Sequence, residues 1–156
     1  MSFNSLGYFR ASVPVDVAAQ ARSLGIATWE SDHKYLPVGS PGLIRKDPNH
    51  GGAAGYSIII RKSDPYYRRR FTVCNLLGHF THHENRIGHQ FVLDPNYRSG
   101  LGTTCDRNAN MIAVEILLPI WLIQACAQKL KTLDPKTLAD ELQVTEAAVR
   151  IRLRLT

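Results

Sequence analysis

The chain has 156 residues, a length that suits one domain or one domain with a small appendage. Its apolar residues (44%) and charged residues (21%) lie near the globular average, which excludes a disordered chain and a fibrous repeat. Lysine and arginine exceed aspartate and glutamate by 19 to 13, and the net charge of +6 permits an acidic partner, nucleic acid included, without requiring one.

The first predicted helix runs from Pro14 to Leu24. A proline suits the first turn of a helix, Asp16 lies beside the positive end of the helix dipole, and Gly25 can cap the other end. The apolar residues of this segment recur at helical spacing, so we expect the helix to lie on a sheet.

Three short strands are predicted in the segments IATWE, GLIRK and GYSIIIR, which are separated by turn-rich stretches. In the third segment, Tyr56, Ile58 and Ile60 alternate with the residues between them and therefore share one face of the strand. This segment is the clearest strand of the chain.

The second half of the chain is mainly helical. Residues 71–83 carry apolar residues and histidines three and four apart, which predicts a helix. A strand is predicted over residues 88–93 and a loop over 94–104. Residues 110–128 are apolar nearly all round, so we expect a helix central to the core, kinked or interrupted at Pro119. Its scattered polar residues favour a buried helix over a membrane span.

The end of the chain predicts two short helices joined by a turn. Asp134 and Pro135 open the first, which runs to Leu142, and Thr145 can cap the second, which ends at Leu153. The order of helix, strands and helices indicates an α+β fold. We divide the chain into a main domain over residues 1–130 and a helical segment over 131–156 packed on it.

The cysteines and the first residues bear on the compartment. Three cysteines form an odd count without CxxC spacing, which argues against a disulfide framework and a structural zinc ribbon. The first residues lack the charged and apolar regions of a secretory signal. We therefore expect a soluble, cytoplasmic protein without a role at the membrane.

The segment RRRFTVCNLLGHFTHH is the most specific part of the sequence. With GYSIII before it and DRNANMIAVEILLP after it, it resembles the ImmA/IrrE-type zinc metallo-endopeptidases of bacteria and phages. The resemblance covers nearly the whole chain and implies a minimal zincin-like (gluzincin) fold. In that fold a small mixed sheet packs against helices, and a helix-turn-helix-like hairpin follows. The matching positions are Arg70, Phe71, Thr72, Cys74, Gly78, His79, Asp106, Ala109, Asn110, Ala113, Glu115, Leu117, Leu118 and Pro119.

A working site of that family carries the motif HExxH. Its two histidines share a helix face and bind one Zn²⁺, a later helix supplies a third ligand, and water takes the fourth position. The glutamate accepts the proton of that water. The resemblance places Asn75 at the first histidine, Leu76 at the glutamate, His79 at the second histidine and Asp106 at the third ligand.

Three of these four positions depart from the pattern. Asn75 offers a neutral amide oxygen where zinc prefers imidazole, and Asp106 is one methylene shorter than glutamate. Leu76 cannot accept a proton, and loss of a general base costs about 10²–10⁴-fold in rate. We interpret the site as catalytically inactive and expect no cofactor. The alternative is weak zinc binding by Asn75, His79 and Asp106 at low occupancy.

Other interpretations of this helix stay open. Leu76 can pack in the core while His79 is held by hydrogen bonds. His79 and His83 are also spaced four apart, so they could bind a metal as an HxxxH pair, although a structural use of His83 is the favoured interpretation. Glu84 directly follows that pair and faces another side of the helix.

Two basic features indicate possible partners. Arg68, Arg69 and Arg70 follow two tyrosines, a mixture that suits phosphates or an acidic partner but is also typical of a solvated helix start. The C-terminal helices have helix-turn-helix spacing, and Arg150 and Arg152 on the second are candidates for nucleic-acid contact. The alternative is a hairpin that caps the domain.

The resemblance implies a regulatory function, since members of the family act on an XRE-type helix-turn-helix repressor. We expect a pseudopeptidase that binds and regulates such a regulator, with the strand of Tyr56, Ile58 and Ile60 as the sheet edge that receives an extended peptide. Two alternatives remain. One is a residual zinc-dependent endopeptidase using His79 and Asp106, and the other is a direct DNA-binding module.

Overall fold

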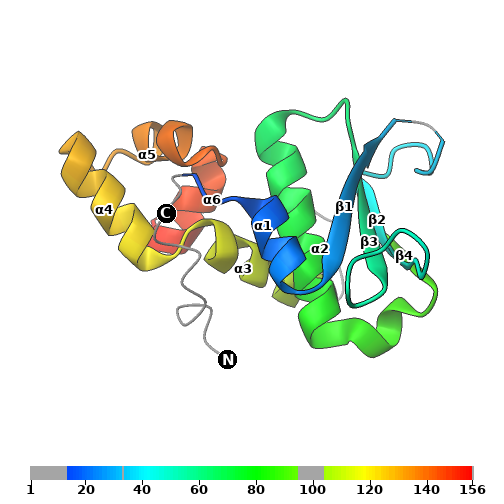
Figure 1. Ribbon diagram of the computed structural model, residues 1–156. Helices are drawn as coiled ribbons and strands as arrows, with labels where there is room; N and C mark the ends of the chain where they lie inside the picture. The colour runs from blue at the N-terminus through cyan, green and yellow to red at the C-terminus, as the bar shows by residue number, and fades with distance from the viewer. Residues whose placement is uncertain (1–13, 33, 95–103, 156) are drawn as a thin grey trace.

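The computed structural model describes residues 14–32, 34–94 and 104–155 (Figure 1). Within these residues, four strands form one mixed sheet and six helices complete the chain, which confirms the predicted α+β class and small zincin-like fold. The sheet stands at one end of the molecule and the last three helices at the other, with the two long helices α2 and α3 between them (Figure 1).

Helix α1 (Val17–Ser23) begins after Asp16, whose side chain accepts a hydrogen bond from the backbone N–H of Ala19 at 3.0 Å. Past its other end, Gly25 has a φ of +76°, a conformation that glycine adopts without steric cost. The helix is shorter than the predicted range 14–24. Asp16 is its N-cap, so the first helical residue is Val17.

The sheet has the strand order β1-β3-β2-β4. Strand β1 pairs in parallel with β3, and β2 pairs antiparallel with both β3 and β4. All four strands were predicted from the sequence, with small differences at their ends. Their bounds are β1 (Ile26–Ser31), β2 (Gly42–Lys46), β3 (Tyr56–Arg61) and β4 (Gln90–Val92).

Strand β3 lies inside the sheet, so the prediction that it is a receiving edge is wrong. Its backbone pairs with β1 on one side and with β2 on the other. The side chains of Tyr56, Ile58 and Ile60, which were expected to meet a partner, are buried in the core. Within the described residues the edge strands are β1 and β4. The alternation of side chains along a strand reveals its two faces but not its neighbours.

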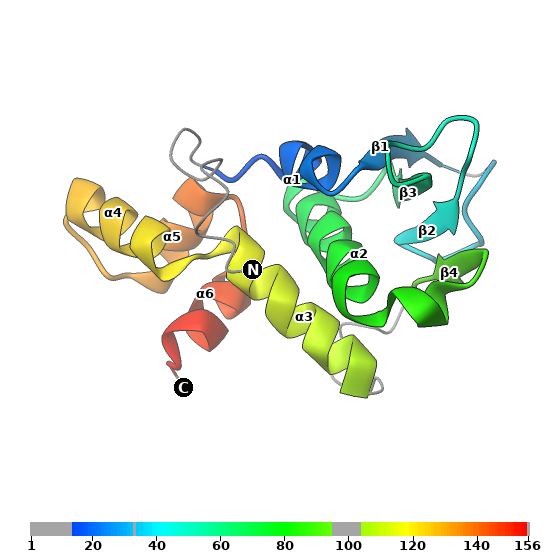
Figure 2. The same ribbon diagram turned by 60° about the horizontal axis from the view of Figure 1, so that its bottom comes forward.

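Helix α2 (Tyr66–Ile87) covers one face of the sheet and lies between the sheet and α3 (Figure 2). It is longer than the predicted range 71–83, since it begins directly after Pro65 and ends directly before Gly88. The arginine run therefore belongs to the helix itself. Residues 72–79 are buried all round, since the sheet and α3 enclose the helix from two sides.

Helices α3 (Thr104–Leu117) and α4 (Ile120–Leu130) replace the single helix predicted over residues 110–128. Pro119 separates them, as predicted, and their axes differ by 44°. In the described part of the chain, no single helix has the length and apolar character to cross a membrane. The bent pair α3 and α4 meets those two criteria only when taken together.

Helices α5 (Pro135–Leu142) and α6 (Glu146–Leu153) form the predicted C-terminal hairpin. Asp134 and Thr145 cap their first turns through side-chain hydrogen bonds to backbone N–H groups. The hairpin packs into the same hydrophobic core as the inner face of the sheet through Leu138, Ala139, Leu142, Ala148 and Val149. The C-cap residues that follow α4, α5 and α6 are Lys131, Gln143 and Arg154, which are not glycines but have φ near +55°.

Arg70 joins the hairpin to the rest of the molecule. Its side chain is buried and donates hydrogen bonds to the backbone carbonyl oxygens of Val15, Leu142 and Gln143. A guanidinium group supplies five N–H donors, so one residue can hold the chain before α1 and the end of α5 against α2. The prediction that Arg70 faces a partner is therefore wrong.

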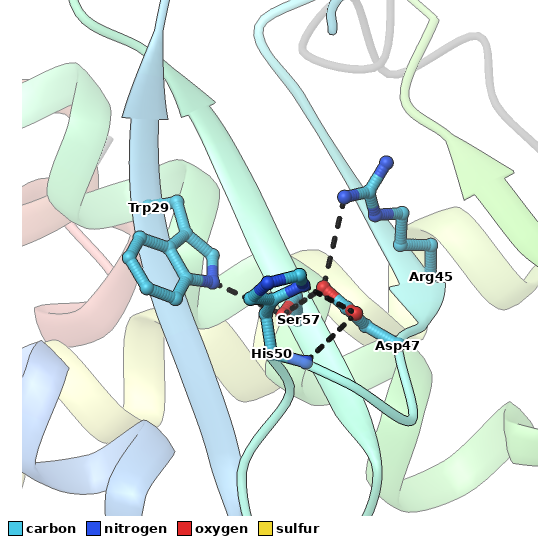
Figure 3. A network of polar contacts seen from close by, with 5 residues as sticks. All are labelled: Trp29, Arg45, Asp47, His50 and Ser57. Carbon is cyan, nitrogen blue, oxygen red and sulfur yellow. Dashed lines mark hydrogen bonds and ion pairs between the residues drawn. The ribbon is translucent and has the colours of Figure 1, made fainter.

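A polar network lies on the opposite face of the sheet (Figure 3). The buried hydroxyl of Ser57 donates to Oδ2 of Asp47 at 2.9 Å and accepts from Nε1 of Trp29 at 3.1 Å. Asp47 also accepts from the backbone N–H of His50 and lies 3.6 Å from the guanidinium of Arg45. Burial raises the pKa of Asp47, but these hydrogen bonds and the positive charge outweigh it and lower the pKa below 3.8.

Candidate metal and catalytic site

Helices α2 and α3 cross closely at Gly78 and Ala109. A Cβ atom on Gly78 would lie 3.0 Å from both the Cα and the carbonyl oxygen of Ala109, so a larger residue would push the helices apart. The residues expected at the site lie on either side of this crossing, on facing sides of the two helices. The close contact of α2 with α3 at Gly78 therefore determines which side chains of the two helices can touch.

The structure brings Asn75, His79 and Asp106 into one region, as the resemblance implies. Nδ2 of Asn75 donates a hydrogen bond to Oδ1 of Asn110 at 2.7 Å. Nε2 of His79 lies 3.5 Å from Oδ1 of Asp106. Positions four apart share a helix face, so the pair 75 and 79 on α2 faces the pair 110 and 106 on α3.

His79 sits where α2, α3 and β4 meet. Its imidazole is buried and lies against the ring of Phe91, with 4.5 Å between the ring centroids. The carboxylate of Asp106 is partly exposed. The imidazole is therefore bounded by an aromatic ring from the sheet and by a carboxylate from α3.

Leu76 is fully buried and belongs to the main hydrophobic core. A Cβ atom on Gly42 would lie 3.4 Å from Cδ1 of Leu76, so this side chain fills the space between α2 and β2. A hydrocarbon in this place can neither accept a proton nor orient a water molecule.

The donor set does not fit a catalytic zinc centre. Such centres use three protein ligands, but at the first position the amide nitrogen of Asn75 donates to Asn110 and an imidazole is lacking. Among the side chains that the structure describes, which do not include that of His83, no three or more of His, Cys, Asp or Glu are grouped to hold a metal ion. Of the side chains described in this region, His79 supplies an imidazole and Asp106 a carboxylate.

The alternative HxxxH pair cannot be placed, because the side chain of His83 lies outside the described residues. His82, Glu84 and His89 near it are exposed. The pairing of His79 with His83 therefore stays a prediction.

The arginines of the run in α2 lie in three different surroundings. Arg70 is the buried residue described above. Arg69 forms an ion pair with Glu30 of β1, with 2.6 Å between Nη1 and Oε1. Arg68 lines a groove between α2, α3 and α6.

The two arginines proposed for nucleic-acid contact lie on α6 and have partners within the chain. Arg150 pairs with Glu146 at 2.9 Å. Nε of Arg152 donates to the backbone carbonyl of Leu118 at 2.9 Å and so attaches α6 to the end of α3.

Sequence reasoning missed two features of this region. One is the hydrogen bond between Asn75 and Asn110, which no spacing rule within one helix indicates. The other is the groove, with a volume of about 620 Å³. A signal for the groove was present, because Met111 and Ile151 are apolar residues at exposed positions of otherwise amphipathic helices.

Comparison with known proteins is informative at the family level. The model of the IrrE N-terminal-like domain family (Peptidase_M78) matches residues 26–154. A comparison with curated proteins finds no match to the chain. The matched range includes the whole sheet, both helices of the candidate site and the whole C-terminal hairpin.

Proposed function

The chain belongs to the IrrE N-terminal-like domain family, and from this premise we propose that it is a pseudopeptidase. In this proposal it binds and regulates an XRE-type helix-turn-helix transcriptional regulator without zinc-dependent proteolysis. The observation that carries the proposal is the burial of Leu76 in the core at the position where the family motif has its general base.

The chemistry of the neighbouring positions supports the proposal. Loss of a general base alone costs about 10²–10⁴-fold in rate. The amide of Asn75 takes the place of an imidazole ligand and is engaged with Asn110, so the metal affinity falls as well. A site with both changes lacks the means to activate water.

Contacts that involve no metal link the helices around these residues. The Asn75–Asn110 hydrogen bond and the close crossing at Gly78 link α2 to α3 directly. Leu76 adds buried apolar surface between α2 and the sheet. A protein that keeps this fold without the catalytic groups retains the surfaces through which it can bind a partner.

The test uses the full chain and a candidate XRE-type helix-turn-helix regulator. We expect elemental analysis to give substoichiometric zinc, size-exclusion chromatography to show a complex, and the regulator to remain intact after incubation with added Zn²⁺. One tightly held Zn²⁺ per chain, together with chelator-sensitive cleavage of the regulator, would contradict the proposal.

A residual metallopeptidase is the second candidate. It is favoured by the buried Oδ1 of Asn75, which has no hydrogen-bond partner among the described residues and could serve as a weak ligand beside His79 and Asp106. In that case His79→Ala abolishes both metal binding and cleavage. For a pseudopeptidase, the same change alters only the stability of the fold.

A further inference from the structure

The groove between α2, α3 and α6 has an apolar floor. Phe71, Val114, Leu117 and Ala148 line it, and Asn110, the partner of Asn75, is part of its wall. At its rim, Met111 is 63% exposed and Ile151 is 68% exposed. Large apolar side chains that stay this exposed beside a concave apolar surface indicate a site for a partner.

The rim of the groove is strongly basic. Four arginines line it, and Glu115 is the acidic residue in its lining. In the described part of the chain, none of these arginines forms an ion pair with a carboxylate. The four are Arg68, Arg107, Arg152 and Arg154. Their charges are therefore available to an acidic ligand.

We propose that this groove binds an acidic amphipathic α-helix of the partner protein. The apolar face of that helix covers Met111, Ile151 and the floor, and its carboxylates meet the arginines. The proposal rests on the proposed function, because the partner is the transcriptional regulator. It adds that the docked helix is not the DNA-reading helix, whose basic residues would meet like charges here.

The apolar floor favours a protein helix over nucleic acid as the occupant. Phosphate groups need positive charge and polar donors but gain nothing from a hydrocarbon surface. An amphipathic helix uses both, since its apolar residues at i, i+3, i+4 and i+7 fill a groove while its flanks stay polar.

The direct test measures the fluorescence anisotropy of a labelled peptide mixed with the full chain. The peptide has roughly 18 residues, enough to form a helix in water, with leucine on one face and glutamate on the other. We expect saturable binding that weakens as salt is raised. Ile151→Ser and Arg107→Glu should each weaken binding about tenfold.

Matched control variants lie on exposed positions outside the groove. Leu133 is 72% exposed, so Leu133→Ser removes a comparable apolar side chain, and Lys62→Glu reverses a comparable charge. Both should leave peptide binding unchanged. Equal loss in groove and control variants would overturn the proposal.

Further outcomes also decide against the proposal. They are absence of saturable binding at low salt, equal binding of a peptide with lysine in place of glutamate, and binding of duplex DNA that Arg107→Glu abolishes while the acidic peptide does not bind.

A parallel pull-down with the regulator separates this proposal from the proposed function. If Ile151→Ser loses the peptide but keeps the regulator, the groove is not the regulator's site and the proposed function stands. If the unaltered chain binds the peptide but no regulator, the proposed function fails and the groove remains a helix-binding site of another partner.

Discussion

Nδ2 of Asn75 lies 2.7 Å from Oδ1 of Asn110 and donates a hydrogen bond to it across the contact between α2 and α3. A hydrogen bond between two neutral side chains contributes about 1 kcal/mol to stability. It occupies the place where a metalloprotease of this family would hold a ligand, so the two helices are joined here by an amide pair.

Asn75→His should restore metal binding. The change places a second imidazole on the face of α2 that carries His79, opposite the carboxylate of Asp106, and so completes a set of three ligands. We expect elemental analysis to show zinc rising toward one ion per chain. Asn75→Gln keeps an amide and should not raise it. No gain in zinc for Asn75→His would mean that the helix positions themselves have lost the metal geometry.

Leu76→Glu should destabilise the fold strongly. The change removes a fully buried leucine and places a carboxylate against β2, where it is cut off from water. We expect the free energy of unfolding to fall by about 3–5 kcal/mol in urea denaturation. Leu76→Met conserves volume and should cost less than about 1.5 kcal/mol. A tolerated glutamate would show that this position is open to solvent.

Gly78→Ala tests the close crossing of α2 and α3. Alanine in a helix interior gains about 1 kcal/mol over glycine, so the substitution alone would stabilise the helix. The new Cβ would lie 3.0 Å from the backbone of Ala109, and overpacking of this kind costs roughly 1–3 kcal/mol. We therefore expect a net loss in thermal denaturation. Asn108→Ala, on the exposed side of α3, should cause no loss.

Arg70→Ala should be far more damaging than Arg69→Ala. Removal of Arg70 leaves the carbonyl oxygens of Val15, Leu142 and Gln143 without their donors, at about 1–3 kcal/mol for each buried group. Arg69 pairs with Glu30 near the surface, and such a pair contributes at most about 1 kcal/mol. Urea midpoints of the two variants give the comparison, and equal losses would contradict the assigned role of Arg70.

Asp47 should make stability depend on pH in the acid range. Its pKa is lowered in the folded protein, so its contribution is fully present above the ordinary value of 3.8 and is lost as pH falls through the lower folded value. The difference in stability between the natural protein and Asp47→Asn should stay constant down to about pH 4 and shrink below it. Trp29→Phe removes only the donor to Ser57 and should keep this pH dependence. If the difference in stability between the natural protein and Asp47→Asn grew below pH 4, the pKa of Asp47 would be raised in the folded protein, which would contradict this prediction.

Local signals in the sequence predicted much of this fold. Asp134 and Thr145 cap helices as expected, and Pro119 separates two helices, because these effects act within one or two turns. Asp16 was placed inside the first helix and is instead its N-cap. The position of β3 between β1 and β2 was not predictable in this way. It depends on pairing between segments far apart in the chain, about which the alternation of Tyr56 to Arg61 carries no information.

The candidate site was predictable in part for the same reason. The spacing of Asn75 and His79 places them on one helix face, whereas their contacts with Asn110 and Asp106 depend on the match of Gly78 with Ala109 between two helices. Arg70 belongs to a run of three arginines, and such a run usually lies on the surface of a protein. Three carbonyl groups from distant segments converge on it and make its burial favourable.

The C-cap residues of α4 and α5, Lys131 and Gln143, have left-handed backbone conformations, and replacing them can raise the thermal stability of the protein. A non-glycine residue in this conformation costs about 1–2 kcal/mol, and glycine avoids that cost while losing about 0.5–1 kcal/mol through the greater freedom of the unfolded chain. Glycine at Lys131 or Gln143 would therefore raise the melting temperature modestly, with the main-chain carbonyl that Gln143 offers to Arg70 retained. The turns that join α4 to α5 and α5 to α6 are thus the simplest places to begin the design of a more thermostable variant.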